Sequence, residues 1–489
     1  MFRHQIYQHL GRHKSDFLKR VETVADKIGM RAEWRNVVGL TGSSSARPSY
    51  LRQDVIDNIV SGAKSPTNLV HYIDQIRELV KQAYGDDYDA CPVNSCEAAL
   101  WLSLEVLSAP PVAGRGDSYR ARYIGLYEAH SEHQLSYGRP FPPKYKDVFA
   151  DRSNISGELG ILGRRLHNLD VIIVSIEGAR YEEHGIKSFI VPLLTTADAA
   201  RTKDRLRTVV DRHGSQITSL ISLGYDTVGY GYGEKKDGVT SDLKKVLGNF
   251  ARELDVPYIV DNARGIPFMG ASLRDINADL MMYSMDKVAG SPISGLIVGR
   301  SECVIPLQRA VGWHSERFGG GVTAYGKGAF SSMDPGREAL IGQVAALSWI
   351  QKNRKVIEMT IDDLCEIVIA EAAPLVERYG SGIHITPSYN GGAVELNYVD
   401  TWLNGKPGLP IFSTEDKAAA MNLVVAGLGV FGILPPSCDE GNVVITPGRG
   451  LVGDDGRLIA DRARVTVRGL ISVLSILGDM VSELAGRSN

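Results

Sequence analysis

A lysine and an acid that could do chemistry together follow two apolar segments of the sequence. Residues 256–260 and 280–283 read as buried strands; Asp261 ends the first, and Lys287 follows the second. Ligands of open parallel sheets bind outside the carboxyl ends of the strands, so the two side chains form a candidate site. A lysine ammonium loses its proton readily when it is desolvated or lies beside other charge, as Schiff-base chemistry requires. The alternative is a structural ion pair between Lys287 and Asp286.

The sequence around Lys287 resembles the cofactor-lysine motif of pyridoxal-phosphate (PLP) enzymes of fold type I. It reads Ser284-Met285-Asp286-Lys287-Val288-Ala289-Gly290, with Pro292 and Gly295 beyond. It is most similar to the order S-x-D-K-x-x-G-x-P-x-x-G of the selenocysteine synthase (seryl-tRNA selenium transferase) branch, from which Met285 and Ser291 depart. The resemblance implies that Lys287 holds PLP as an internal aldimine and that Asp261 pairs with the pyridine nitrogen.

The resemblance also implies a seat for the cofactor phosphate. An apolar run at residues 88–93 leads to Asn94, Ser95 and Cys96, which open a predicted helix. Free backbone N–H groups at a helix start bind anions. Type I enzymes place the phosphate on small polar residues directly before a helix, so these three residues are its expected contacts; a plain helix cap is the alternative.

Other residues expected to contact the cofactor are Arg264, Ser284, His130, Gly321 and Thr323. His130 would stack on the pyridine ring, with His133 as second choice, although either could be a surface histidine. Two histidines without a third spaced ligand do not predict a zinc site. Gly321 and Thr323 belong to a glycine-rich loop of the kind that, in relatives, crosses the dimer interface to the neighbour's cofactor; a mobile connector is the alternative.

Arginines near the carboxyl terminus are candidates for the substrate carboxylate. Residues 463–469 alternate as a strand, which places Arg468 at its end. In many type I enzymes an arginine on the corresponding strand grips the substrate α-carboxylate through two parallel hydrogen bonds. Arg449 is the second choice, and a surface ion pair of Arg468 with Asp461 or Asp479 is the alternative.

A glycine- and serine-rich loop at residues 39–50 supplies further substrate candidates, namely Ser43, Ser44 and Arg47. It lacks the GxxxxGK[ST] order of a nucleotide-binding loop. In relatives an amino-terminal loop often reaches the active site, and an ordinary loop is the alternative.

Short apolar strands alternate with amphipathic helices, which predicts an α/β fold with a mostly parallel central sheet and helices on both faces. A smaller α/β carboxyl-terminal domain completes the architecture of a fold type I PLP-dependent transferase. The expected domains are an amino-terminal helical arm and loop (1–75), a large PLP-binding domain (76–335) and a small domain (336–489).

Composition excludes some classes of partner. The 489 residues carry 54 basic and 57 acidic side chains, so the net charge of −3 gives no global field for nucleic acid or membrane. Five scattered cysteines without CxxC spacing favour a reducing, cytoplasmic setting. The amino terminus lacks the apolar core of a signal peptide, and no apolar run of about 18 residues predicts a membrane helix.

One local patch could still bind nucleic acid. Residues 1–36 hold eight Lys or Arg against four acids, and in selenocysteine synthases an amino-terminal region binds tRNA. A solvated helix face or a dimer-embracing arm is preferred here, because no aromatic residues are interleaved for base stacking.

The sequence therefore predicts a PLP-dependent lyase or transferase that acts on a free amino acid, by Cβ elimination or replacement or by Cα–Cβ cleavage. The alternatives are a selenocysteine-synthase-like transferase acting on an aminoacyl-tRNA, an aminotransferase and a silent scaffold. A homodimer or larger homo-oligomer is expected, because type I active sites are completed by a neighbouring subunit.

Overall fold

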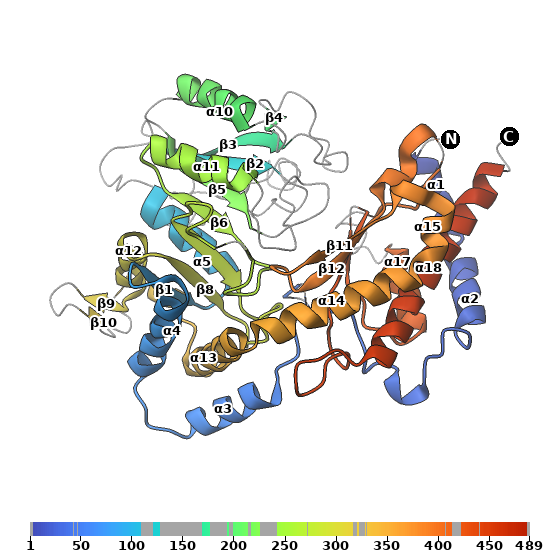
Figure 1. The fold of residues 1–489 in the computed structure, drawn as a ribbon, viewed down its shortest axis with the longest axis horizontal. Helices are drawn as coiled ribbons and strands as arrows, with labels where there is room; N and C mark the ends of the chain where they lie inside the picture. The colour runs from blue at the N-terminus through green and yellow to red at the C-terminus, as the bar shows by residue number, and fades with distance from the viewer. Residues whose placement is uncertain are drawn as a thin grey trace, which may run out of the picture. The chain divides into compact units, whose positions relative to one another are not determined.

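The structure is a computed structural model, shown in Figure 1, and it describes most of the chain. The described residues are 3–42, 44–45, 47–108, 121–127, 169–176, 193–194, 199–213, 217–224, 242–270, 272–315, 320–321, 328, 330–405, 407–412, 422–439 and 441–486. The chain forms two compact units. We call Asp54–Lys352 the sheet unit, and Met1–Gln53 together with Asn353–Asn489 the terminal unit.

These units differ from the expected domains. The predicted arm divides, because α3 (Gln53–Ala63) and α4 (Leu69–Tyr84) fall almost entirely in the sheet unit. The predicted small domain loses α13 (Arg337–Lys352), which lies beside α4 in Figure 1 and packs against it. Gln343 on this helix donates a hydrogen bond from Nε2 to the carbonyl of Gly295, at 3.2 Å. This contact with the sheet explains why the boundary falls after α13 and not at the Pro335-Gly336 pair.

The sheet unit is built on eight strands in the order β1-β8-β7-β6-β5-β2-β3-β4. Their bounds are β1 (Tyr88–Val93), β8 (Gly295–Arg300), β7 (Leu280–Ser284), β6 (Tyr258–Asp261), β5 (Ile217–Leu223), β2 (Ala121–Tyr127), β3 (Leu169–Ile176) and β4 (Leu193–Leu194). Only β8 runs against the others, so the predicted mostly parallel sheet is confirmed. The side chains of β1, β6 and β7 are buried along their whole length, as expected for strands covered on both faces.

Helices cover this sheet, which makes the unit an α/β layered structure. Besides α4 and α13, they are α5 (Cys96–Ser103), which continues as a π-helical turn at Leu104–Ser108, α10 (Ala199–His213), α11 (Asp242–Glu253) and α12 (Ser301–Val311). The helix α3, apart from Gln53, belongs to the same unit. The amphipathic α4 is fixed to β1 by a two-pronged ion pair, in which Arg77 donates to both carboxylate oxygens of Asp89 at 2.8 and 2.9 Å. A short ribbon, β9 (His314–Ser315) with β10 (Gly320–Gly321), follows α12.

The terminal unit holds a four-stranded antiparallel sheet in the order β11-β12-β14-β13. The strands are β11 (His384–Ser388), β12 (Ala393–Asn397), β14 (Asn442–Ile445) and β13 (Ser437–Asp439). Its helices are α1 (Arg3–Arg12), α2 (Lys14–Val24), α14 (Arg354–Glu371), α15 (Ala373–Tyr379), α17 (Leu423–Val430) and α18 (Ala460–Gly486). One hydrophobic core joins the two ends of the chain: Phe17 and Val21 on α2 are buried in the same cluster as Leu470 and Leu474 on α18.

The strand predicted at residues 463–469 is wrong, because this segment lies in the first half of α18. Ala463, Val467, Leu470 and Leu474 are all buried and recur every three or four residues, which is the period of a helix packed on one face. The helix is long and apolar enough to pass a length-and-composition test for a membrane span. Most of its apolar window is buried within the protein, as in a core helix.

Candidate active site

The sheet topology brings the predicted catalytic segments to one edge. Asp261 ends β6, Ser284 ends the neighbouring parallel β7, and Val93 ends β1. Because β8 runs in the opposite direction, its first residue, Gly295, pairs with both Ser284 and Val93. The carboxyl ends of β1, β6 and β7 and the start of β8 therefore lie at the same edge of the sheet. The loop that bears Lys287 begins at this edge.

Asp261 is a buried acid with 1% of its surface exposed. Its Oδ1 accepts a hydrogen bond from the backbone N–H of Ala263 at 3.1 Å. Its carbonyl accepts from Gly224 N–H at 2.8 Å, and Asn262 N–H donates to Met282 O at 2.9 Å. The ends of β5 and β7 thus hold the backbone around the carboxylate, which fixes where its charge lies.

Lys287 lies in a tight loop between β7 and β8. Its N–H donates to Ser284 O at 3.2 Å, and Ser291 N–H closes the loop on Met285 O at 2.9 Å. Gly290 has a φ of +68°, in the left-handed region where a side chain would be strained. The loop is therefore a defined turn, and the half-buried lysine leaves it directly beyond the sheet.

Asp286 is adjacent to Lys287 in the sequence, but its carboxylate is hydrogen-bonded to Ser284. Its Oδ1 accepts a hydrogen bond from the Ser284 hydroxyl at 2.7 Å. Its Oδ2 is buried and has no hydrogen-bond partner among the described residues. A buried carboxylate oxygen without a hydrogen bond destabilises the folded state, and a ligand that donates a hydrogen bond to it would remove this penalty. The bond also occupies the single hydroxyl proton of Ser284.

The amino end of α5 lies against this loop. A Cβ added to Gly295 would overlap the Ser95 carbonyl, so the helix start and β8 are in direct backbone contact. Ser95 caps the helix by accepting from Ala98 N–H at 3.1 Å. Asn94 donates from Nδ2 to Ser332 O at 2.9 Å. Both side chains therefore have structural partners, so a phosphate seat here rests on the backbone N–H groups of the first helical turn.

Cys96, the first residue of α5, links the helix start to the catalytic pair. Burial, the largest cause, raises the pKa of its thiol well above the ordinary value; the charge of Asp261 adds to the rise, and the charge of Lys287 opposes it. Charges act on a thiol this way only when they lie close to it. The thiol therefore stays protonated. The strand pairings and the approach of Gly295 to Ser95 place the start of α5 at the edge of the sheet that bears Asp261 and Lys287.

For other predicted site residues, the structure shows burial or backbone contacts. Arg264 follows Asp261 and is half-buried, and Gly321 pairs with His314 in the β10–β9 ribbon. Ser44 and Arg47 form an isolated bridge in the terminal unit, where Arg47 N–H donates to Ser44 O at 2.9 Å. His130, His133, Thr323 and Ser43 lie outside the described residues.

Arg47 has an unusual environment for a loop arginine. Its Nη1 is buried and has no hydrogen-bond partner within the described part of the chain. Burial lowers the pKa of its guanidinium. A buried cationic donor without an acceptor is a binding feature for an anion.

Arg468, in contrast, already has a carboxylate partner for its guanidinium group. On α18 it donates from Nε and Nη2 to the two carboxylate oxygens of Glu371, both at 2.9 Å. This two-pronged pair joins α18 to α14, and Arg464 adds a second, longer contact with Glu371 at 3.8 Å. The strand-end position from which an anchoring role was inferred does not exist. Arg449 is exposed in a turn, where its carbonyl accepts from Gly39 N–H at 2.9 Å.

One buried cation at the candidate site was missed from the sequence. Lys244 on α11 is 2% exposed and donates from Nζ to the carbonyl of Gly224 at 2.8 Å. Gly224 follows β5 and is itself bonded to the Asp261 backbone, so Lys244 helps to fix that strand end. Lysines on amphipathic helices usually face water, and nothing in the sequence marks this one as buried. Among the described residues, no group of three His, Cys, Asp or Glu side chains could hold a metal ion.

Known proteins resemble the fold but not the sequence. No family model matches the chain, and no curated protein matches it either. The taurine:2-oxoglutarate aminotransferase from Bifidobacterium kashiwanohense, solved with PLP and glutamate, has a TM-score of 0.54 at 12% identity over 87% of this chain and 85% of that one. The SepCysS–SepCysE N-terminal domain complex has a TM-score of 0.51 at 12% identity, with 93% and 96% covered.

A third structure, ureidoglycine–glyoxylate aminotransferase from Bacillus subtilis, has a TM-score of 0.51 at 10% identity and covers 93% of this chain and 98% of its own. Identities this low show the fold alone. The chain has the fold of the type I PLP-dependent enzymes, as the sequence around Lys287 implied.

Proposed function

We propose that this protein is a PLP-dependent enzyme that acts on a small-molecule amino acid and that Lys287 is the residue to which the cofactor attaches. The observation that carries the proposal is the meeting of Lys287, Asp261 and the start of α5 at one edge of the sheet. The fold shared with PLP-dependent enzymes supports it.

The residues at this edge fit the cofactor. Asp261 offers a buried carboxylate for the proton of the pyridine nitrogen. The first turn of α5 offers backbone N–H groups for the phosphate. Gly295 lets the Lys287 loop approach this turn closely, because it has no Cβ. The orphaned Oδ2 of Asp286 is a further polar atom that gains a partner when a ligand with donors is present.

When bound, PLP supplies an electron sink for charge that develops at the substrate Cα. The chain's own residues would do the rest. The Lys287 amine would take the proton from Cα and return it, acting as general base and then acid. Asp261 would hold the proton on the ring nitrogen, and because it is buried its charge would act through a low dielectric. The neutral Cys96 thiol would border the site without attacking the substrate.

Arg47 is the proposed partner of the substrate α-carboxylate. Its buried, unpartnered Nη1 supports this assignment, and the planar guanidinium matches a carboxylate. Arg47→Met should raise KM for an amino acid by about tenfold or more, as expected for one lost charge-assisted hydrogen bond, with kcat changed much less. An unchanged KM would exclude the role.

The proposed reaction is a lyase or transferase reaction at Cβ or at the Cα–Cβ bond of a free amino acid. An aminotransferase is the second candidate, because two of the similar solved structures are aminotransferases and the same lysine and acid would serve that reaction. Product release from amino acids tested singly would support the first candidate. An absolute requirement for a 2-oxo acid acceptor would support the second.

The cofactor assignment is tested on the full-length protein incubated with PLP. Reduction with borohydride followed by peptide mass mapping should place the pyridoxyl group on the peptide that contains Lys287. Lys287→Ala should lose both this label and turnover, while Lys245→Ala, on neighbouring α11, should keep both. A label on the buried Lys244, or full activity of Lys287→Ala, would overturn the assignment.

A further inference from the structure

A polar hollow of about 580 Å³ lies at the edge of the sheet opposite the candidate active site. It opens beside Tyr88, the first residue of β1, and Arg300, the last residue of the antiparallel β8. The same strands lead at their other ends to Ser95 and Gly295. The hollow is thus separated from Lys287 by the length of a strand, about 15–20 Å for five or six residues. Nothing in the proposed function uses it.

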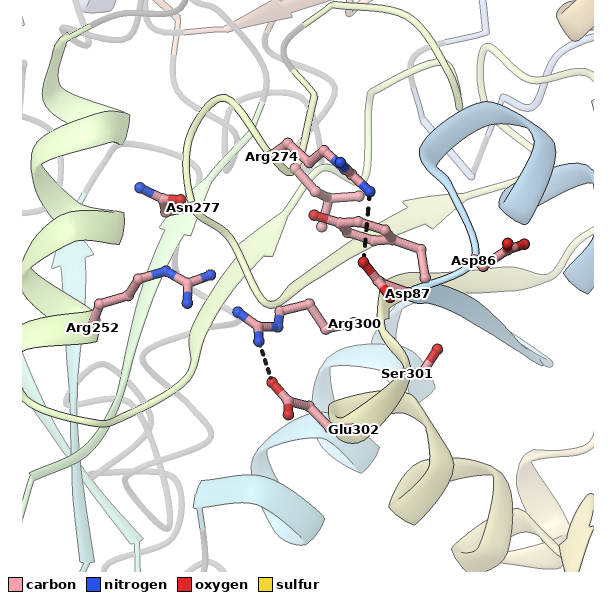
Figure 2. A pocket seen from close by; sticks show the side chains of 10 residues that line it. Asp86, Asp87, Arg252, Arg274, Asn277, Arg300, Ser301 and Glu302 are labelled. Carbon is pink, nitrogen blue, oxygen red and sulfur yellow. Dashed lines mark ion pairs between the residues drawn. The ribbon is translucent and has the colours of Figure 1, made fainter. Parts of the chain in front are cut away.

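Three arginines from three different elements line this hollow, which we call the arginine pocket. Arg252 comes from the last turn of α11, Arg274 from the loop between β6 and β7, and Arg300 from the end of β8. In Figure 2, Arg252 and Arg300 extend toward one another. The Arg274 guanidinium carbon is 5.3 Å from the centre of the Tyr88 ring.

The electrostatics of Tyr88 show that the three cations converge. Burial raises the pKa of the Tyr88 hydroxyl, while Arg274, Arg300 and Arg252 each oppose the rise. Three guanidinium groups that act on one hydroxyl also repel one another. A bound anion would remove that repulsion.

Three acids, Asp86, Asp87 and Glu302, line the same hollow, and all three are exposed to solvent. Exposed acids neutralise nearby cations only weakly. Asp87 is 3.9 Å from Arg274, and its side chain is 90% exposed. Glu302 pairs with Arg300 at 2.6 Å but is 66% exposed, and such solvent-facing pairs contribute about 1 kcal/mol or less. Arg252 has no acid within 4 Å among the described residues, although its charge and that of the nearly buried Asp279 act on each other at longer range. Its guanidinium therefore remains available to a ligand.

Arg300 has one further acidic neighbour, which is already engaged. Asp279 lies 3.8 Å from Arg300 Nε and is nearly buried. Its Oδ2 accepts from the backbone N–H of Tyr258 at 2.8 Å. Asp279 therefore orients Arg300 from behind the pocket and does not occupy the pocket itself.

We propose that the arginine pocket binds a small phosphorylated molecule through its dianionic phosphate group. Guanidinium groups donate to phosphate oxygens in pairs, and the Ser301 hydroxyl lines the same hollow as an additional donor. Asn277 lines it too, but its Nδ2 already donates to Asn249 Oδ1 at 2.6 Å. Ser301 also opens α12, whose amino end favours negative charge.

Calorimetric titration of the full-length protein tests this proposal. The protein is first loaded with PLP and then freed of unbound cofactor by desalting, so that a phosphate seat at the opposite edge of the sheet is filled while no free PLP competes for the pocket. Ionic strength is held constant with chloride. Inorganic phosphate and pyrophosphate are the probes, and the dicarboxylate malonate is the comparison. We expect saturable binding of one pyrophosphate per chain, at least tenfold tighter than malonate.

Arg252→Gln is the informative variant, because Arg252 is exposed on the last turn of α11 and its loss should not disturb folding. It should weaken pyrophosphate binding by about tenfold or more. Arg207→Gln, an exposed arginine of α10 outside the pocket, is the matched control and should bind as the wild type does. Equal weakening by both variants, unchanged binding by Arg252→Gln, binding that never saturates, or malonate binding as tight as pyrophosphate binding would each overturn the proposal.

Discussion

Asp261 is the residue whose charge the proposed chemistry depends on most directly. Asp261→Asn keeps the size of the side chain and the acceptor for Ala263 N–H, so PLP should stay bound. A neutral amide cannot hold the pyridinium proton, and removal of the substrate Cα proton should slow by about a hundredfold or more. Exchange of that proton in deuterated water measures the step. An exchange rate equal to that of the exposed control Asp255→Asn would show that Asp261 is only structural.

Arg468 and Arg47 make a contrasting pair, because one has its donors satisfied and the other does not. Arg468→Met removes the two bonds to Glu371 that join α18 to α14. We expect unfolding free energy to fall by about 1 kcal/mol, since the pair is partly exposed and Arg464 remains near Glu371. KM for the amino acid should not change. Denaturant unfolding and steady-state kinetics check the two statements, and a tenfold rise in KM would restore the anchoring role.

At the residue scale the sequence reveals chemistry only where the local pattern is unambiguous. Asp261 and Lys287 could be singled out as candidates because each polar side chain ends or follows an apolar strand, and the structure has strands at those places. Arg468 could not be placed, since five alternating residues look the same in a strand and at the edge of a helical stripe. Lys244 gave no signal at all, because its burial depends on a carbonyl at Gly224 that only the tertiary structure brings to it.

Among the elements, the contact between β8 and α5 is the one on which the site depends. Gly295→Ala would place a methyl group in the Ser95 carbonyl and push the helix start away from the Lys287 loop. We expect a loss of stability of about 1–3 kcal/mol, as for overpacking elsewhere, together with a large loss of PLP affinity. Thermal unfolding and titration with PLP measure the two effects.

The control for that experiment is Gly429→Ala in α17, where an added Cβ meets no atom within 4 Å. Alanine in a helix is favoured over glycine by about 0.5–1 kcal/mol, so this variant should be slightly more stable and should bind PLP normally. A Gly295→Ala protein that behaves like Gly429→Ala would show that the close approach is not needed for the cofactor.

The strands of the sheet unit were largely predictable, whereas the division of the chain was not. Residues 88–93 and 280–283 match β1 and β7 to within one residue, because continuous apolar runs of this length are typical of buried parallel strands. The helix α13 lies in the sheet unit and not with the segment that follows it, and no local pattern shows that Gln343 would bond to Gly295. Contacts between distant segments set such boundaries.

At the scale of the whole molecule, the proposed cofactor should stabilise one unit more than the other. Lys287, Asp261 and α5 all belong to the sheet unit. A ligand at a thousandfold excess over its Kd stabilises the folded state by about 4 kcal/mol. Removing PLP should therefore speed hydrogen exchange in peptides from β6, β7 and α5, with much smaller changes in α18. Equal changes in both units would contradict a cofactor site built mainly from the sheet unit.

We also expect the protein to be at least a homodimer, on the basis of the resemblance of the Lys287 segment to type I enzymes. Sedimentation velocity at the concentration of the activity assay measures the assembly. An active monomer would contradict this expectation and would remove the proposed role of the Gly321 loop in a neighbouring subunit.

The pairing of both chain ends in the terminal unit constrains how the protein can be made. The ribosome must synthesise about 435 residues between the end of α2 at Val24 and the start of α18 at Ala460, which takes roughly 20–90 s at typical elongation rates. During this time α2 would expose Phe17 and Val21, which are fully buried in the finished protein. The sheet unit, being continuous in sequence, can fold first. Newly made amino-terminal helices should therefore be bound by chaperones until the last helix, α18, emerges to cover them.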